Sequence, residues 1–195
     1  IAVDSVATRL DKAQQQGAEI INFQDENPAE EILKLTGRIG ADKALDAVGI
    51  DAEIAKVLSK SQKQQDFQQQ RQEIRSKDFS EEKSSKQWHP GDAPSESILW
   101  CVESLIKGGT ISVVGVYPPE MRFFPFGKAF GKNLTIRAGN CNHRKYVNQL
   151  MNMTAGGVVD PSFIITEKQP FNKIIDCYQM FDEKKPDWLK VMIEI

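Results

Sequence analysis

The pattern of apolar and polar positions predicts short buried strands separated by amphipathic helices. The chain opens with IAVD, a short apolar run that ends in an acid. The following SVATRLDKAQQQG predicts a helix, with Leu10 and Ala13 on one face and Gly17 as its stop. EIINF then predicts a second short strand, so the opening segment is expected to form a βαβ unit.

The same alternation continues to the end of the chain. Asn27-Pro28 predicts the start of a helix, PAEEILKLTG, which ends at Gly37 and precedes a strand, ADKALDAVG. PSESILWCVESLIKGG predicts a helix whose C-cap is the glycine pair and which leads into the strand TISVVGVY; its apolar face is Ile98, Val102, Leu105 and Ile106. Further elements are expected at LTIRAG (strand), YVNQLMNMTAGG (helix), FIIT (strand), FNKIIDCYQMF (helix) and LKVMIEI (strand). This order predicts an α/β fold with a parallel sheet.

A polar segment, residues 50–94, interrupts this pattern. It is rich in Gln, Lys, Glu and Ser and is too long for an ordinary loop. An amphipathic turn or two is expected at its start, from Ile50, Ile54, Val57 and Leu58, and anchoring of its last part is expected from Trp88, His89 and Pro90-Gly91. Two interpretations remain open: a solvated insertion on the surface, or a flap over a ligand.

Composition and charge exclude several classes of partner. With 195 residues, 40% of them apolar, the chain can bury the core of one domain, and its net charge of −2 offers no basic surface for nucleic acid. No apolar run approaches the length of a membrane span, so we expect no membrane partner. Three widely spaced cysteines favour a reducing, cytoplasmic location.

Asp4 is the first candidate functional residue. Ligands of open parallel sheets bind beyond the carboxyl ends of the strands, where an acid after the second strand accepts hydrogen bonds from the ribose hydroxyls of a nucleotide. Asp4 ends the first predicted strand of this chain. DAVG and SVVGV each add a glycine at a strand's carboxyl end, which permits close approach of a ligand. The alternative is that Asp4 only caps the following helix.

These features admit two classes of enzyme. One is a dehydrogenase that binds a dinucleotide. The other is an S-adenosylmethionine-dependent methyltransferase, which also has an acid after its second strand. The segment LIKGGTISVVG resembles the helix-GG-strand segment of these methyltransferases. The periodicity of the strands does not separate them.

Several segments resemble the corresponding segments of one protein family, both in their amino-acid sequence and in their order along the chain. They are IAVDSVATRLDKAQQQGAEIINF, LTGRIGADKALDAVG, GGTISVVGVYPP, KNLTIRAGN, GGVVDPSFIITEKQPF and WLKVMIEI. Together they resemble the coenzyme-binding half of the zinc-dependent alcohol dehydrogenases of the medium-chain dehydrogenase/reductase family. The long insertion after DAVG is similar to that of the formaldehyde dehydrogenase-like branch.

The resemblance implies a Rossmann-type doubly wound parallel sheet that lacks its first strand and its glycine-rich turn. In the family both precede the strand that IAVD matches, so we expect a segment upstream of Ile1 to be absent. The resemblance divides the chain into the first part of an NAD-binding domain, the insertion, and a second part that returns towards a catalytic domain; their ranges are 1–49, 50–94 and 95–195.

The resemblance also places the family's zinc ligands upstream. Within this chain Cys141 and His143 are the only close Cys/His pair, and two ligands do not make a zinc site. We expect that pair to serve local packing and hydrogen bonding. Zinc is therefore expected in the intact enzyme only, and this chain alone is predicted to be inactive.

Nine cofactor contacts follow from the resemblance, position by position. They are Asp4 and Arg9 at the adenosine ribose, Val48 and Gly49 on the same side, Val114 and Val116 at the nicotinamide, Arg137 and Gly139 at its carboxamide, and Lys190 at the pyrophosphate. The alternative for the three valines is that they are ordinary apolar residues, as found in the core of any sheet, with no role in binding.

The expected enzyme transfers hydride between an alcohol and NAD, with a small alcohol or aldehyde as its substrate. The family commonly pairs through the edge strand of this domain, which predicts a homodimer or homotetramer with contacts near PPEMRFFPF and LTIRAG. Outside catalysis, the alternative is an NAD-binding or interaction module that uses the Gln-rich insertion as a partner surface.

Overall fold

The computed structural model describes residues 1–56, 61–78, 91–119, 121–183 and 187–195. The chain divides into two compact units. The first unit consists of Ile1–Asn22 and Cys141–Ile195, and the second of Phe23–Asn140. Parallel strands form the sheets of both units.

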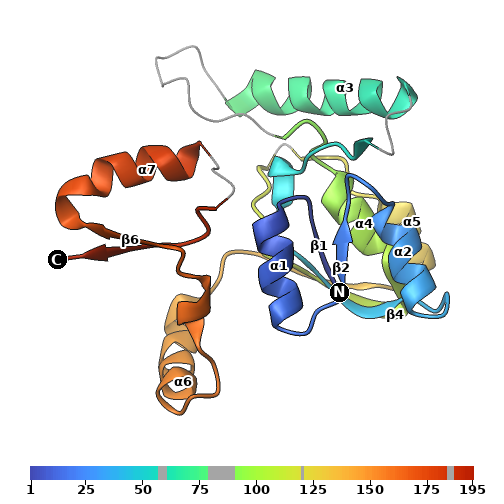
Figure 1. Ribbon diagram of the computed structural model, residues 1–195. Coiled ribbons are helices and arrows are strands. Elements are labelled where there is room, and N and C mark those ends of the chain that lie inside the picture. The colour runs from blue at the N-terminus through green and yellow to red at the C-terminus, as the bar shows by residue number, and fades with distance from the viewer. Residues whose placement is uncertain (57–60, 79–90, 120, 184–186) are drawn as a thin grey trace. The chain divides into compact units, whose positions relative to one another are not determined.

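The first unit begins with the βαβ arrangement that the sequence predicts (Figure 1). Strand β1 (Ala2–Asp4) leads into helix α1 (Ala7–Gln15), and β2 (Ile20–Asn22) pairs with β1 in parallel. Gly17 ends the helix in a left-handed conformation, with φ of 84°, that suits glycine. Leu10 of α1 and Ile21 of β2 are buried, and burial of these apolar side chains stabilises the unit.

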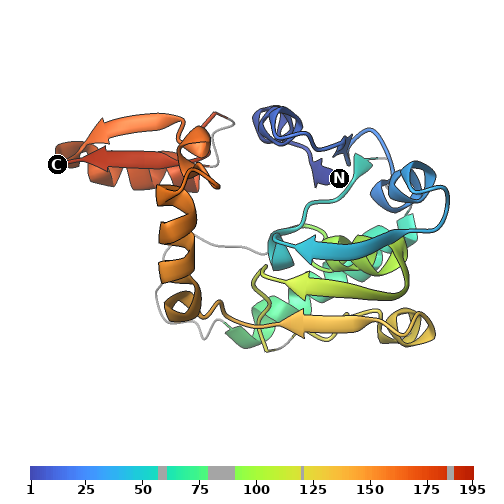
Figure 2. The ribbon, with the colours of Figure 1, turned by 90° about the horizontal axis from the view of Figure 1, so that it is seen from below.

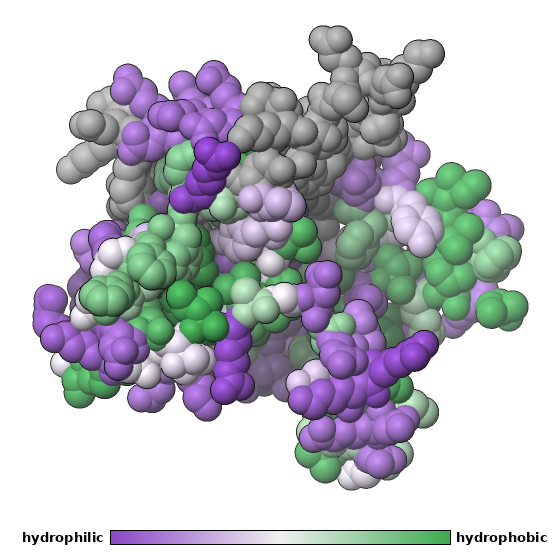
Figure 3. Space-filling view, turned by 180° about the vertical axis from the view of Figure 1, so that it is seen from behind, coloured by the Kyte–Doolittle hydropathy of each residue, from purple (hydrophilic) through white to green (hydrophobic). Residues whose placement is uncertain are grey.

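The rest of the first unit holds α6 (His143–Ala155), the 3₁₀ helices η3 (Pro161–Ile164) and η4 (Phe171–Lys173), β6 (Glu167–Pro170), α7 (Ile174–Asp182) and β7 (Val191–Glu194). Strands β6 and β7 pair in parallel, and α7 lies along their sheet (Figure 2). Hydrophobic side chains remain exposed over this part of the chain (Figure 3). Phe171, Ile175 and Phe181 are 60%, 79% and 49% exposed.

The predicted strand at FIIT is wrong. Pro161 is the first residue of a 3₁₀ turn instead, since its fixed φ suits a helical start. The Asp160 carboxylate accepts from the Ser162 N–H at 2.9 Å and from its hydroxyl at 2.6 Å, which stabilises the turn. The apolar residues of FIIT therefore precede the strand, and the more polar EKQP forms β6.

The second unit is a three-stranded parallel sheet in the order β3-β4-β5, with helices packed on it (Figure 2). Its main elements are α2 (Pro28–Leu35), β3 (Ala41–Asp46), α4 (Glu96–Ser104), β4 (Leu105–Val113), α5 (Phe126–Gly131) and β5 (Thr135–Ala138). The Asn27 side chain caps α2 by accepting from the N–H of Ala29 at 3.0 Å, as expected for Asn-Pro. The hydrophobic core joins α4, β4 and α5 through Ile98, Val102, Leu105, Ile111 and Ala129.

The end predicted for helix α4 is wrong, because the helix stops at Ser104 and LIKGG begins β4. Gly108, with φ of 78°, lies where the register of β4 against β3 shifts, and its N–H donates to the Lys132 carbonyl at 2.8 Å. The glycines therefore serve an irregularity inside the strand rather than a helix C-cap. Leu105 is buried all the same, now as a strand residue.

The polar insertion contains a helix that the sequence analysis missed. Ile50 lies in the short 3₁₀ helix η1 (Gly49–Asp51), and residues 52–55, with Ile54, are not helical. The 18-residue helix α3 (Ser61–Asp78) follows, since Gln, Lys, Arg and Glu favour helices. Its signal was Phe67 and Ile74, 5% and 0% exposed, on one face. Val57, Leu58, Trp88, His89 and Pro90 lie outside the described residues.

The α/β prediction with parallel strands is confirmed, and the pairing leaves two edges open. Among the described strands, β1 pairs with β2 alone, and β3 pairs with β4 alone. In the strand order expected for this fold class, 3-2-1-4-5-6, a single strand, the first, neighbours both the second and the fourth strands, which β1 and β3 match. None of the described helices combines the length and apolar composition needed to cross a membrane.

Candidate functional site

Asp4 is held at the carboxyl end of β1 by its own turn. Its Oδ1 accepts from the N–H groups of Ser5 at 2.8 Å and Val6 at 2.9 Å, and its Oδ2 lies 3.5 Å from Arg9 Nη1. Val6, and not Asp4, is the N-cap residue of α1. A carboxylate has about four acceptor positions, so this one keeps capacity for hydroxyl donors.

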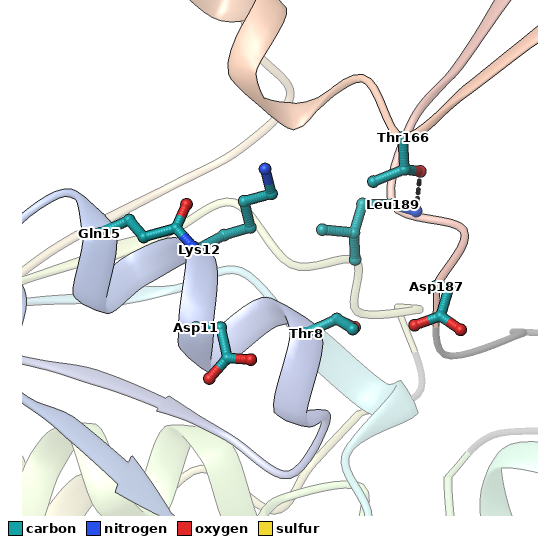
Figure 4. Close-up of a pocket in the computed structure, with 7 residues that line it drawn as sticks. All are labelled: Thr8, Asp11, Lys12, Gln15, Thr166, Asp187 and Leu189. Atoms are coloured by element: carbon teal, nitrogen blue, oxygen red, sulfur yellow. Dashed lines mark hydrogen bonds between the residues drawn. The ribbon is translucent and has the colours of Figure 1, made fainter.

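The segment of Lys190 lies beside helix α1 in the same unit. A pocket of about 320 Å³ is lined by Thr8, Asp11, Lys12 and Gln15 of α1 and by Thr166, Asp187 and Leu189 (Figure 4). Figure 4 shows the side chains of α1 on one side of this pocket and Thr166, Asp187 and Leu189 on the other, where the Leu189 N–H donates to Thr166 Oγ1 at 3.0 Å. Arg9 and Leu189 both line a second pocket. Lys190 follows Leu189 and is exposed.

In the second unit, the loop after β3 is in direct contact with the loop after β4. The Ile50 N–H donates to the Val116 carbonyl at 3.1 Å. A Cβ on Gly49 would lie 2.4 Å from Val116 O, and one on Gly115 would lie 2.2 Å from Gly49 N. Neither position has room for a side chain, so glycine is required at both for the loops to meet.

Three candidate valines on these loops are exposed rather than buried. Val48 is 48% exposed, Val114 61% and Val116 74%. The interpretation that they are ordinary sheet core is therefore wrong. Exposed apolar groups at the carboxyl ends of parallel strands are typical of a surface that contacts a ligand ring.

Arg137 and Gly139 belong to the third strand of this sheet. Arg137 lies on β5 opposite Ser112, within the strand expected at LTIRAG, and its side chain is exposed. Val113 pairs with Ala138. Gly139 therefore follows β5 at the same end of the sheet at which Val114 follows β4, and its φ of 137° suits glycine.

Sequence reasoning missed a buried acid at the centre of this site, Asp46. It is 2% exposed, and its Oδ1 accepts from the N–H groups of Val48 at 3.0 Å and Gly49 at 3.1 Å. Its Oδ2 accepts from the Tyr117 hydroxyl at 2.6 Å. The available signal was an acid inside the otherwise apolar ALDAVG, where a buried carboxylate needs partners.

Burial shapes the electrostatics around Asp46. Desolvation, together with the hydrogen bond to Asp46, raises the pKa of Tyr117 far above its usual range. Burial, followed by the charge of Asp46, raises the pKa of the Cys101 thiol to about 12. Both groups are therefore neutral at physiological pH, and the Tyr117 hydroxyl keeps its proton and donates a hydrogen bond to the carboxylate.

The nine predicted residues fall into two sets, one in each unit. The first unit holds Asp4, Arg9 and Lys190, and the second holds Val48, Gly49, Val114, Val116, Arg137 and Gly139. In the described part of the chain, no group of three His, Cys, Asp or Glu side chains could hold a metal ion. The His143 N–H donates to the Cys141 carbonyl at 3.0 Å, a local main-chain turn.

Parallel strands that alternate with helices define a protein of the α/β class. Comparison with known proteins narrows this class, although no family model matches the chain. An uncharacterized zinc-type alcohol dehydrogenase-like protein, AdhB of Bacillus subtilis, is 28% identical over 195 residues, which are 100% of this chain and 45% of the relative. An alcohol dehydrogenase of Cupriavidus necator is 22% identical and matches 100% of this chain and 42% of its own length.

Solved structures give the same result. The alcohol dehydrogenase TADH from Thermus sp. ATN1 superposes with a TM-score of 0.71 at 25% identity, over 99% of this chain and 44% of that protein. The zinc-dependent alcohol dehydrogenase 2 from Streptococcus pneumonia gives 0.68 at 22% identity, over 98% of this chain and 43% of that one.

The resemblance to zinc-type alcohol dehydrogenases and the Rossmann-type fold are thereby confirmed. The chain spans less than half the length of the curated relatives that it matches end to end.

Proposed function

We propose that this chain is the coenzyme-binding part of an NAD-dependent, zinc alcohol or formaldehyde dehydrogenase-like oxidoreductase. The observation that carries the proposal is the match to alcohol dehydrogenases along the whole chain. It favours this function over the methyltransferase and over the non-catalytic module. Since the relatives are about twice as long, we expect activity from the longer protein and not from these 195 residues alone.

The described residues fit the coenzyme. The Asp4 carboxylate has acceptor capacity for two ribose hydroxyls, and the exposed valines offer an apolar surface for a ring. When bound, NAD supplies the hydride acceptor, and the protein supplies binding and orientation. The zinc that the relatives' names imply has no ligand set among the described residues, so we assign it no place on them.

Each candidate residue has a proposed role in holding the coenzyme. We assign the adenosine ribose to Asp4, Arg9, Val48 and Gly49, the nicotinamide and its carboxamide to Val114, Val116, Arg137 and Gly139, and the pyrophosphate to Lys190. The exposed side chains of Arg9 and Lys190 are compatible with contacts to a phosphorylated ligand.

The partners and location are proposed on the same grounds. The substrate is a small alcohol or aldehyde. A second copy of the protein is proposed to pair along the edge strand β5, all of whose residues are exposed, in a dimer or tetramer. Three free cysteines favour a cytoplasmic enzyme.

The test measures NADH formation and NAD binding in the full-length protein. We expect alcohol-dependent NADH formation, zinc in the purified protein, and NAD affinity that falls in Asp4→Asn. Glu19→Gln, at an exposed acid between α1 and β2, is the matched control and should bind NAD as the wild type does. Binding of S-adenosylmethionine in place of NAD, or no NADH with any alcohol tested, would refute the proposed function.

A further inference from the structure

One residue joins the two loops that carry four of the nine candidate coenzyme contacts, Val48, Gly49, Val114 and Val116. The carboxylate of Asp46 accepts from the N–H groups of Val48 and Gly49 in the loop after β3. Its main-chain carbonyl accepts from Val114 at 2.8 Å and Gly115 at 2.9 Å in the loop after β4. Asp46 therefore contacts both loops, through different atoms.

A second link runs through the side chain of Tyr117. Its hydroxyl donates to Asp46 Oδ2 at 2.6 Å, a length typical of a strong hydrogen bond to a charged acceptor. Ser97 Oγ lies 3.3 Å from the Tyr117 hydroxyl and 3.5 Å from the Gly49 carbonyl. Helix α4, which carries Ser97, thus belongs to the same network, in a buried setting where such bonds are strong.

The two loops have little freedom to separate or to close further. They touch at Gly49 and Gly115, where a Cβ would overlap the opposing main chain. A change in the length or charge of the Asp46 link therefore shifts the main chain next to Val48 and Val116. Those two valines are exposed on the surface proposed to bind the coenzyme.

We propose that Asp46 is a positioning residue, whose buried carboxylate sets the spacing of the loops 47–50 and 114–117 and thereby the coenzyme surface that they form. The identity of the ligand rests on the proposed function. The spacing of the loops does not, because it follows from contacts within the chain. A carboxylate is costly to bury, and here it satisfies three donors from two loops that no local element connects.

The first test needs no coenzyme. Amide hydrogen exchange is measured in the full-length protein with Asp46→Asn, with the milder Tyr117→Phe, and with Asp42→Asn, an exposed acid on the same strand, as the control. We expect the Val48 and Gly49 amides to exchange at least about tenfold faster in Asp46→Asn, while the amides of the β4–β5 ladder are unchanged. Unchanged exchange at Val48 and Gly49 would overturn the proposal.

The second test separates positioning from simple stability. In Asp46→Asn and Tyr117→Phe we expect the KM for NAD to rise at least about tenfold, and the KM for the alcohol to stay the same. If Asp46 had a purely structural role, the substitutions would lower the urea midpoint of unfolding and leave the KM for NAD unaltered. That result would overturn the proposal that Asp46 is a positioning residue. If the wild type does not bind NAD, the proposed function fails, and the exchange experiment alone decides the role of Asp46. Should Asp46→Asn not fold, Tyr117→Phe carries both tests.

Discussion

Two lysines four residues apart, Lys128 and Lys132, are predicted to differ sharply in their effect on stability. The ammonium of Lys132 donates to the carbonyls of Val102 at 3.0 Å, Glu103 at 2.7 Å and Leu105 at 2.7 Å. These carbonyls lie at the C-terminal end of α4, where helix N–H partners run out. Lys128 instead pairs with the Glu103 side chain, and the two side chains are 59% and 35% exposed.

The expected magnitudes follow from these contacts. Hydrogen bonds to a charged group contribute about 1.5–3 kcal/mol, and a cation at a helix C-terminus adds about 0.3–1 kcal/mol. Burial lowers the pKa of Lys132, so desolvation offsets part of this gain. We therefore expect Lys132→Met to lower the free energy of unfolding by about 2 kcal/mol. Lys128→Met should cost between about 0 and 1 kcal/mol, as exposed ion pairs do.

Urea unfolding of the full-length protein, monitored by circular dichroism, measures the decrease in the free energy of unfolding in both variants. Methionine keeps the length and the apolar stem of lysine, so the comparison isolates the ammonium. Amide exchange at the last turn of α4 should accelerate in Lys132→Met and not in Lys128→Met. Equal losses in the two variants, or a larger loss in Lys128→Met, would refute the assignment of Lys132 as the cap of α4.

Four further predictions concern the coenzyme and the cysteines. The enzyme should have a higher kcat/KM with NAD than with NADP, because the 2'-phosphate would meet the Asp4 carboxylate and like charges repel; steady-state kinetics giving the reverse order would contradict this. Lys190→Ala should weaken NAD binding, measured by calorimetry, by about tenfold or more, whereas Lys168→Ala, exposed on β6, should have no effect. At pH 8, alkylation followed by mass spectrometry should modify the exposed Cys141 well before Cys101, whose pKa of about 12 keeps its thiol neutral. The raised pKa of Cys101 also predicts a contribution to stability that is complete below pH 9 and is lost as the pH rises towards 12.

Helix ends were predicted correctly where a residue close in the sequence marks the end. Asn27 caps α2 through its side chain, and Gly17 ends α1 in the left-handed region; both features need only neighbouring residues. The predictions failed where contacts with residues distant in the sequence determine the secondary structure. LIKGG belongs to a strand because β3 pairs with it, and Lys132, distant in the sequence, caps the helix before it.

The sequence by itself determined the α/β alternation, the acid at the end of β1 and the glycines after β3 and β4, because periodicity, turn residues and strand ends are local properties. Only the tertiary structure decided which of these residues act together. Asp46 and Tyr117 are 71 positions apart, and their hydrogen bond exists because β3 and β4 pair in parallel and bring both loops to one end of the sheet. The same pairing leaves Val48, Val114 and Val116 exposed, although their apolar character alone favours the core. A buried carboxylate is stable only with its partners in place, and no pattern within a single segment specifies partners that the fold supplies.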